Sequence, residues 1–113
     1  MIEVRRGDVV LVADRGGGEY AGKPRPAVVV QGDAFAATVS VVVCLLTTTE
    51  LDAPLLRLPL PPSDSLPLRE PSWIMVDKIA AVSQRRIGGM LGRLRREDQL
   101  RLDRALVTLL GIG

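Results

Sequence analysis

Histidine is absent from this chain of 113 residues, and there is a single cysteine, Cys44. The lack of histidine excludes Ser-His and Cys-His catalysis, histidine zinc sites and the paired-histidine mechanism of many ribonucleases. One cysteine can form neither an internal disulfide nor a thiolate zinc site, and it fits a reducing compartment. Arginine, hydroxyl and carboxylate groups therefore remain as the chemically useful side chains.

Aromatic residues and long apolar runs are also scarce. Only Tyr20, Phe35 and Trp73 are aromatic, so the core must consist of Val, Leu, Ile and Ala. Residues 9–13 are too few for a signal peptide, and residues 41–46 are too few for a membrane-spanning helix. We expect one domain over residues 1–113, in the cytoplasm and without a membrane segment.

The net charge of +2 conceals an uneven distribution along the chain. Residues 1–84 carry eight cations and ten acids, whereas residues 85–113 carry seven arginines and three acids. An excess of arginine favours a phosphate or carboxylate partner, although a solvated arginine-rich helix face would give the same count.

Prolines and glycines separate short apolar segments, a pattern typical of a small β-rich domain. Strands are predicted at residues 9–13, 27–31, 38–46, 55–60 (an edge strand), 72–82 and 90–94. From Arg96 the apolar spacing changes to that of an amphipathic helix ending at Gly111. Its predicted apolar stripe consists of Leu100, Leu102, Ala105, Leu106, Leu109 and Leu110. Arg95 is a poor N-cap, and Glu97 and Arg101 have the spacing of an i,i+4 pair.

Arg25 lies between two prolines at the start of the second predicted strand. Each proline fixes its own φ and biases the preceding residue toward extended backbone, so the guanidinium is held in place. A preorganised guanidinium suits a phosphate or a carboxylate, because its planar fork donates two parallel hydrogen bonds. A proline-rich strand start with a solvated arginine has the same sequence.

Polar residues at two further places complete the list of candidates. Three threonines, Thr47 to Thr49, follow the most apolar strand. They can belong to a functional site only if Thr47 faces the same cavity as Arg25. Otherwise their hydroxyls form hydrogen bonds with backbone groups left unpaired at the strand end. Asp77 and Lys78 interrupt an apolar strand and point to opposite faces. If Asp77 is buried it needs a partner, for which Arg25 and Lys23 are candidates.

This inventory is thin for most enzymes but sufficient for one reaction, the cleavage of RNA by its own 2′-hydroxyl. The substrate supplies the nucleophile, and the protein has to orient the phosphate, stabilise negative charge on the phosphorane and move protons. Neither a metal nor another cofactor is required.

Five segments, in order, resemble the PemK/MazF family of toxins. They are residues 6–10 (RGDVV), 22–29 (GKPRPAVV), 43–48 (VCLLTT), 71–79 (PSWIMVDKI) and 87–94, which leads into the terminal helix. The resemblance implies a mainly β fold with a C-terminal helix, an SH3-like barrel of the CcdB/Kid/MazF type. It also implies a symmetric homodimer with metal-independent endoribonuclease activity on single-stranded RNA, inhibited by a cognate antitoxin.

The resemblance also implies roles for individual residues. Arg25 matches the catalytic arginine of the family, Thr47 its threonine, and Asp77 an acid that Kid-type members use near the scissile phosphate. Gly18 and Met75 replace a histidine and a second arginine of those members, which favours a mechanism based on Arg25 and Thr47.

We expect Arg25 to stabilise the pentacoordinate phosphate and Thr47 to donate to a non-bridging oxygen. Because a guanidinium stays protonated, Glu19 or Asp77 is the better general base. The RNA is expected to contact Glu19 and Thr48 as well, and its phosphates should follow Lys23, Arg69 and Arg57, which could equally be ordinary surface charges.

Two other functions are compatible with a small barrel. A CcdB-like topoisomerase (gyrase) poison would act by binding alone, but it does not need Arg25 and Thr47 together, and residues 110–113 contain no tryptophan to anchor such binding. The other is a noncatalytic interaction module.

The arginine-rich last quarter could hold an acidic antitoxin tail or be a solvated helix face.

Overall fold

The computed structural model describes residues 3–13 and 24–113. These residues form six β-strands and a C-terminal α-helix, joined in part by two short 3-10 helices. The elements are β1 (Asp8–Val12), β2 (Arg25–Val29), η1 (Asp33–Phe35), β3 (Ser40–Thr47), β4 (Arg57–Leu60), β5 (Ser72–Ser83), η2 (Gln84–Arg86), β6 (Ile87–Arg93) and α1 (Arg96–Leu110). The mainly β architecture with one terminal helix agrees with the fold class predicted from the sequence.

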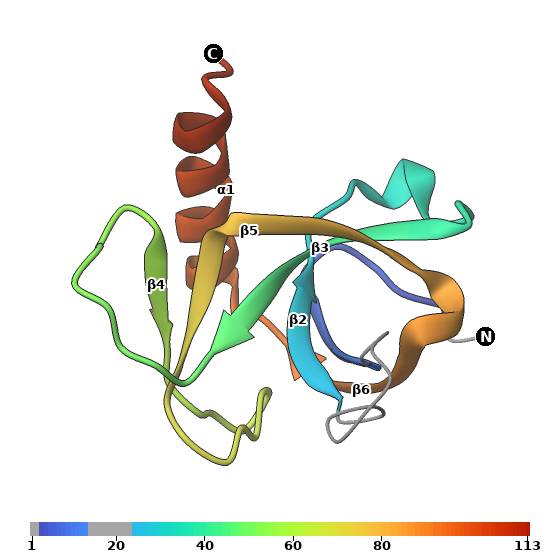
Figure 1. The fold of residues 1–113 in the computed structure, drawn as a ribbon, viewed down its shortest axis with the longest axis horizontal. Coiled ribbons are helices and arrows are strands. Elements are labelled where there is room, and N and C mark those ends of the chain that lie inside the picture. Colours follow the sequence, from blue (N-terminus) through green and yellow to red (C-terminus); the bar gives the residue numbers. More distant parts are fainter. Residues whose placement is uncertain (1–2, 14–23) are drawn as a thin grey trace, which may run out of the picture.

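The strands form one antiparallel sheet in the order β4-β5-β3-β2-β1-β6. The sheet curls into a partly open barrel, and α1 stands against it beside β4 and β5 (Figure 1). β4 is an edge strand, as its prolines predicted. Within residues 3–13 and 24–113, no helix has the length and apolarity to cross a bilayer.

Both faces of the curled sheet are buried by aliphatic side chains. Alternation along β3 sends Cys44 and Leu46 to one face and Val41 and Val43 to the other. The first face packs against Leu102 and Leu106 of α1, and the second face packs against Val12, Val82 and Ile87 of other strands. Val and Ile of the strands therefore supply more than half of the buried apolar residues and Leu most of the rest, as the shortage of aromatics predicted.

The start of α1 is set by acids in its first turn and not by a capping side chain. The Arg95 side chain makes no cap hydrogen bond. Asp98 is buried and accepts hydrogen bonds from Arg95 Nε (3.3 Å) and Arg101 Nη2 (2.7 Å). The predicted pairing of Glu97 with Arg101 is therefore wrong, because Arg101 lies against β4, where it reaches Asp98 and the carbonyl of Pro59.

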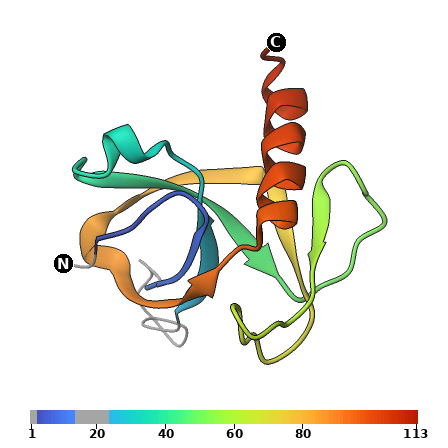
Figure 2. The ribbon, with the colours of Figure 1, turned by 180° about the vertical axis from the view of Figure 1, so that it is seen from behind.

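The predicted apolar stripe of α1 is wider than the face that the sheet covers. Leu102 and Leu106 are buried, whereas Leu100 is 47% exposed and Leu110 is 55% exposed. Seen from behind, the C-terminal end of α1 projects beyond the sheet (Figure 2). Gly111 ends the helix in the left-handed conformation (φ 69°), as predicted.

The last strand begins at Ile87, three residues before its predicted start at Met90. Gly89 pairs with Leu11, and the β1–β6 register shifts on either side of this stretch. The glycines that suggested a turn thus lie inside a strand with irregular pairing. Further along β6, Gly92 lies directly against the backbone of Ser65 and Leu66.

This close approach predicts the effect of adding one methyl group to β6. A Cβ on Gly92 would overlap the Ser65 carbonyl oxygen and lie 3.1 Å from Leu66 Cα, so backbone must move. We expect Gly92→Ala to lower the free energy of unfolding by about 1–3 kcal/mol, measured by urea denaturation. Gly89→Ala is the matched control, because a Cβ there meets nothing within 4 Å. Equal stabilities of the two variants would contradict the prediction.

Candidate active site

Arg25 is the first residue of β2 and stands at the edge of the barrel opening. It pairs with Val12 of β1, and its side chain is exposed. Pro24 and Pro26 flank it, and neither can donate a hydrogen bond to a neighbouring strand. The backbone that carries Arg25 is therefore restrained while its guanidinium faces outward.

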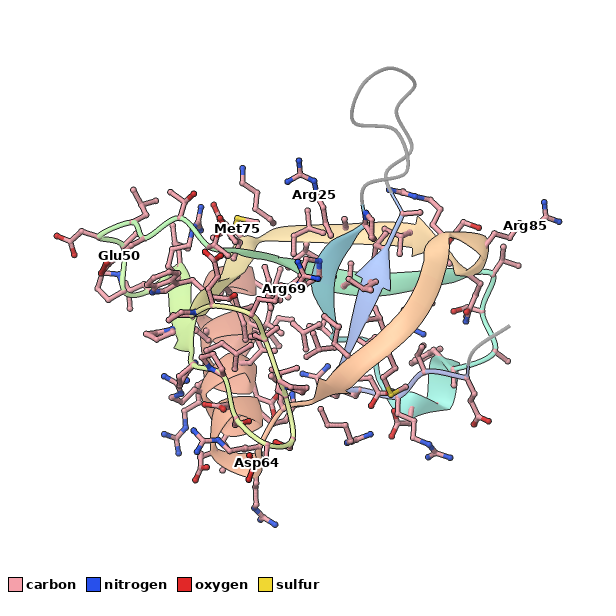
Figure 3. The ribbon with its side chains drawn as sticks, turned by 90° about the horizontal axis from the view of Figure 1, so that it is seen from below. Arg25, Glu50, Asp64, Arg69, Met75 and Arg85 are labelled. Atoms are coloured by element: carbon pink, nitrogen blue, oxygen red, sulfur yellow. The ribbon has the colours of Figure 1, made fainter. Side chains whose placement is uncertain are left out.

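Arg25 lines a cavity of about 280 Å³ together with the three consecutive threonines that follow β3. The strand order explains the meeting, because β3 pairs with β2 on one side and with β5 on the other. The described residues that line it are Arg25, Pro26, Leu46, Thr47, Thr48, Thr49, Ser72 and Met75. Figure 3 shows Arg25 and Met75 on the same rim of the molecule, far from Arg85. Thr47 thus faces the same cavity as Arg25, the condition that the sequence left open.

The hydroxyl of Thr47 is oriented by the backbone that follows it. The amide of Thr49 donates to Thr47 Oγ1 over 3.1 Å. This contact uses an acceptor position of the hydroxyl and leaves its O–H available as a donor. Thr47 can therefore donate a hydrogen bond to an anion held by Arg25.

Asp77 occupies a different position from the one expected. It is exposed, and its carboxylate accepts a hydrogen bond from Arg57 Nη1 at 2.5 Å, so neither burial nor pairing with Arg25 is observed. β4 and β5 bring these residues together, since Arg57 lies opposite Met75 in the register. The sequence suggested Arg25 or Lys23 only as partners for a buried Asp77, and the observed partner comes from an edge strand 20 residues away in sequence.

The ion pair also lowers the basicity of Asp77. Desolvation alone would raise the pKa of this carboxyl, but the hydrogen bond and charge of Arg57 hold the pKa below its ordinary value. Asp77 does not belong to the cavity lining. Arg57, which was expected to contact RNA phosphates, is poorly placed to do so. Its side chain is only 11% exposed and forms a salt bridge with Asp77.

The other predicted contact residues fall into three groups. Thr48 lines the cavity, whereas the exposed Arg69 does not, although it projects near Arg25 and Met75 in the view of Figure 3. Glu19 and Lys23 lie outside the described residues, as does Gly18.

Sequence reasoning missed Ser72 as part of the cavity. Its hydroxyl donates to the Glu70 carbonyl over 3.2 Å, and the residue is buried. The only available signal was its place directly before the apolar run of β5.

Cys44 takes no part in this cavity. It is buried within the core, and burial raises the pKa of its thiol to about 11. The thiolate is the nucleophilic form of cysteine, so Cys44 is unsuited to nucleophilic catalysis.

The family described as PemK-like, MazF-like toxin of type II toxin-antitoxin system matches residues 5–110 of the sequence. The chain belongs to this family. It is 44% identical over 110 residues to "Probable endoribonuclease MazF" of Mycolicibacterium smegmatis, covering 97% of this chain and 99% of that protein.

Solved structures of the MazF class have the same fold. An endoribonuclease from a Mycobacterial species, solved with its cognate antitoxin, aligns with a TM-score of 0.78 and 27% identity, over 100% of this chain and 98% of that one. MazF of Deinococcus radiodurans, in a MazE-MazF structure, aligns with a TM-score of 0.78 and 20% identity, over 100% of both chains.

The protein is thus a MazF-family endoribonuclease toxin of a toxin-antitoxin system. The alternative of a CcdB-like topoisomerase poison is not favoured. The resemblance seen in the five sequence segments is confirmed over nearly the whole chain.

The ion pairs of Asp77 and Asp103 should make the free energy of unfolding depend on pH. Desolvation opposes ionisation of Asp103, but hydrogen bonds from Arg6 and Gln99 lower the pKa of this carboxyl, as Arg57 does for Asp77. When the folded pKa is lowered, the unfolded chain takes up protons first as the pH falls. The stabilisation is complete above the unfolded pKa of about 3.9 and is lost as the pH falls through the folded pKa.

We expect Asp77→Asn and Asp103→Asn each to flatten the acid side of the profile of unfolding free energy against pH. Both acids are partly exposed, so each effect should not exceed about 1 kcal/mol. Urea denaturation between about pH 6 and pH 3 measures it, with the exposed loop variant Asp64→Asn as the control. A wild-type acid slope in both ion-pair variants would disprove the assignment.

Proposed function

We propose that the protein cleaves single-stranded RNA selectively and without a metal, with Arg25 and Thr47 as the catalytic pair. The observation that carries the proposal is the shared cavity of a restrained guanidinium and a hydroxyl whose donor is available. A phosphate placed there meets a cation and a hydrogen-bond donor, which are the groups that charge on a phosphorane requires.

The reaction proposed is transesterification within the RNA. The 2′-oxygen attacks the adjacent phosphorus, the O2′–P bond forms, and the P–O5′ bond breaks. The products are a 2′,3′-cyclic phosphate and a free 5′-hydroxyl, after one proton leaves the 2′-oxygen and one reaches the 5′-oxygen. Arg25 stabilises charge on the non-bridging oxygens, while Thr47 donates to one of them.

Proton transfer requires a group other than the guanidinium. Asp77 is engaged by Arg57 and does not line the cavity. Of the two carboxylates considered, we therefore assign removal of the 2′-proton to Glu19. The location of Asp77 near the scissile phosphate stays a prediction.

This mechanism predicts different losses for different changes at the two catalytic residues. We expect Arg25→Ala to reduce kcat by about 10²–10³, because one preorganised electrostatic donor is lost. Arg25→Lys should recover part of the rate, since it keeps the charge but not the planar fork. Thr47→Val should lose activity and Thr47→Ser should retain most of it, because only the serine keeps the hydroxyl.

The measurement is cleavage of a long single-stranded RNA in EDTA, with mass spectrometry of the new ends. Arg85→Ala is the matched control for loss of an exposed arginine, since Arg85 lies at the far end of the molecule (Figure 3). Unfolding midpoints establish that each variant is folded. Full cleavage by Arg25→Ala, or products without cyclic phosphates, would refute the mechanism.

We further propose a homodimer that acts in the cytoplasm and is inhibited by an acidic antitoxin segment. The Mycobacterial relative was solved with its cognate antitoxin, which supports a protein partner here. On the exposed side of α1, Arg96 and Arg104 lie four residues before and after Leu100. Among the described residues, no carboxylate lies within ion-pair distance of either arginine. This side of the helix offers two positive charges around an apolar side chain to an acidic peptide.

Charge reversal on this side of α1 should weaken inhibition but spare catalysis. We expect Arg96→Glu/Arg104→Glu to lower antitoxin affinity at least about tenfold at low salt, because surface charge acts over roughly a Debye length. Arg85→Glu is the control, and calorimetry at several salt concentrations measures the affinity. Unchanged affinity with an unchanged salt dependence would place the antitoxin elsewhere.

A further inference from the structure

A second hollow lies on the other side of Arg25. Its volume is about 290 Å³, close to the lower end of the roughly 300–1,000 Å³ typical of ligand pockets. Its lining is Val12, Arg25, Leu45, Ala80, Ala81, Val82 and Arg86. Among residues 3–13 and 24–113, only Arg25 lines both this hollow and the threonine cavity.

The two hollows adjoin at the start of β2, because Arg25 lines both of them and consecutive residues at the end of β3 line one or the other. Arg25 pairs with Val12, and Ala27 pairs with Leu45. Residues two apart in a strand share a face, so Leu45 and Thr47 lie on one face of β3, whereas Leu46 of the threonine cavity lies on the other. Arg25 therefore lies between two adjoining depressions at the start of β2, each of which can hold part of one extended RNA strand.

The two hollows differ in chemistry. Hydroxyls dominate one, while the other has an aliphatic floor with a guanidinium at each side. Arg86 is itself positioned, because its Nε donates to the Ala13 carbonyl over 2.9 Å. Unstacked RNA bases are bound by apolar surfaces and by the planes of arginine guanidinium groups, and few aromatics are present here to do so.

We propose that this hollow is a subsite for the nucleobase next to the phosphate that Arg25 holds. The proposal rests on the proposed function, because Arg25 fixes the phosphate from which the neighbouring base is reached. The base lies against the aliphatic floor, with Arg86 beside it and toward the next phosphate. The threonine cavity performs the chemistry, and the aliphatic hollow contributes to the choice of cleavage position.

Ala80→Leu tests the proposal by filling the hollow while leaving Arg25 and Thr47 intact. Ala80 is half-buried on the floor. We expect KM for the preferred oligonucleotide to rise at least about tenfold, with kcat changed less, because a misfitting group in a pocket acts on binding. End-sequencing of a digested long RNA should also show a changed base preference at one position that flanks the cleaved bond.

Matched variants keep the test decisive. Ala34→Leu adds the same bulk on an exposed 3-10 helix outside both hollows, and Arg85→Gln is the control for Arg86→Gln. If Ala80→Leu does not fold, Ala81→Leu places the same group at an exposed position of the lining. We expect Arg86→Gln to raise KM and reduce the salt dependence of RNA binding.

Each outcome has a single meaning. Unchanged KM and base preference in folded Ala80→Leu overturn the subsite. A change of oligomeric state in that variant, measured by sedimentation, also overturns it, because a second copy of the chain then covers the hollow. Wild-type protein that leaves RNA intact in EDTA contradicts the proposed function instead.

Discussion

The pairing of β3 with β2 on one side and β5 on the other is the constraint on which the site depends. This pairing places the start of β2 beside the end of β3, so Arg25 and Thr47 meet although 22 positions separate them in the sequence. The same pairing buries Val43 and Cys44 on opposite faces. Because a slip of one residue would exchange the two faces, the core that holds the sheet together also fixes the geometry of the cavity.

The arginines of the molecule divide by environment. Arg57, Arg93 and Arg101 each bind a carboxylate, and in the last two cases that carboxylate is buried. The first two pairs join different strands and the third lies within α1, where Arg101 also reaches the Pro59 carbonyl of β4. A buried acid without its partner would be strongly unfavourable. Arg25 differs because the chain restrains its backbone through prolines, which leaves its guanidinium at an exposed position. The high arginine content therefore serves ion pairs that stabilise the fold as well as the binding of a substrate.

Local patterns in the sequence predicted the strands, the helix and its end at Gly111, because alternation, periodicity and glycine geometry are local properties. They did not predict the partner of Asp77, since the register between β4 and β5 depends on the whole sheet. The prediction of the apolar stripe on α1 was too wide for a similar reason. The apolar periodicity of the helix continues past the point where the sheet ends, so Leu110 is apolar but exposed. For the site, the sequence supplied Arg25, Thr47 and Thr48, and the fold added Ser72 and the hollow next to Arg86.

Arg25 lies between a hydroxyl-lined cavity and an aliphatic one, and we assign a different task of a nuclease to each: catalysis to the first and base selection to the second. Stabilising a phosphorane requires hydrogen-bond donors in fixed positions. The Thr47 hydroxyl is held in position by the hydrogen bond that it accepts from the Thr49 amide. Selecting a base requires shape and apolar contact, which small residues such as Ala80 and Ala81 can change without moving the donors. Because Arg25 lines both cavities, a base that fits the aliphatic hollow poorly also weakens binding of the neighbouring phosphate, so discrimination appears mainly in KM.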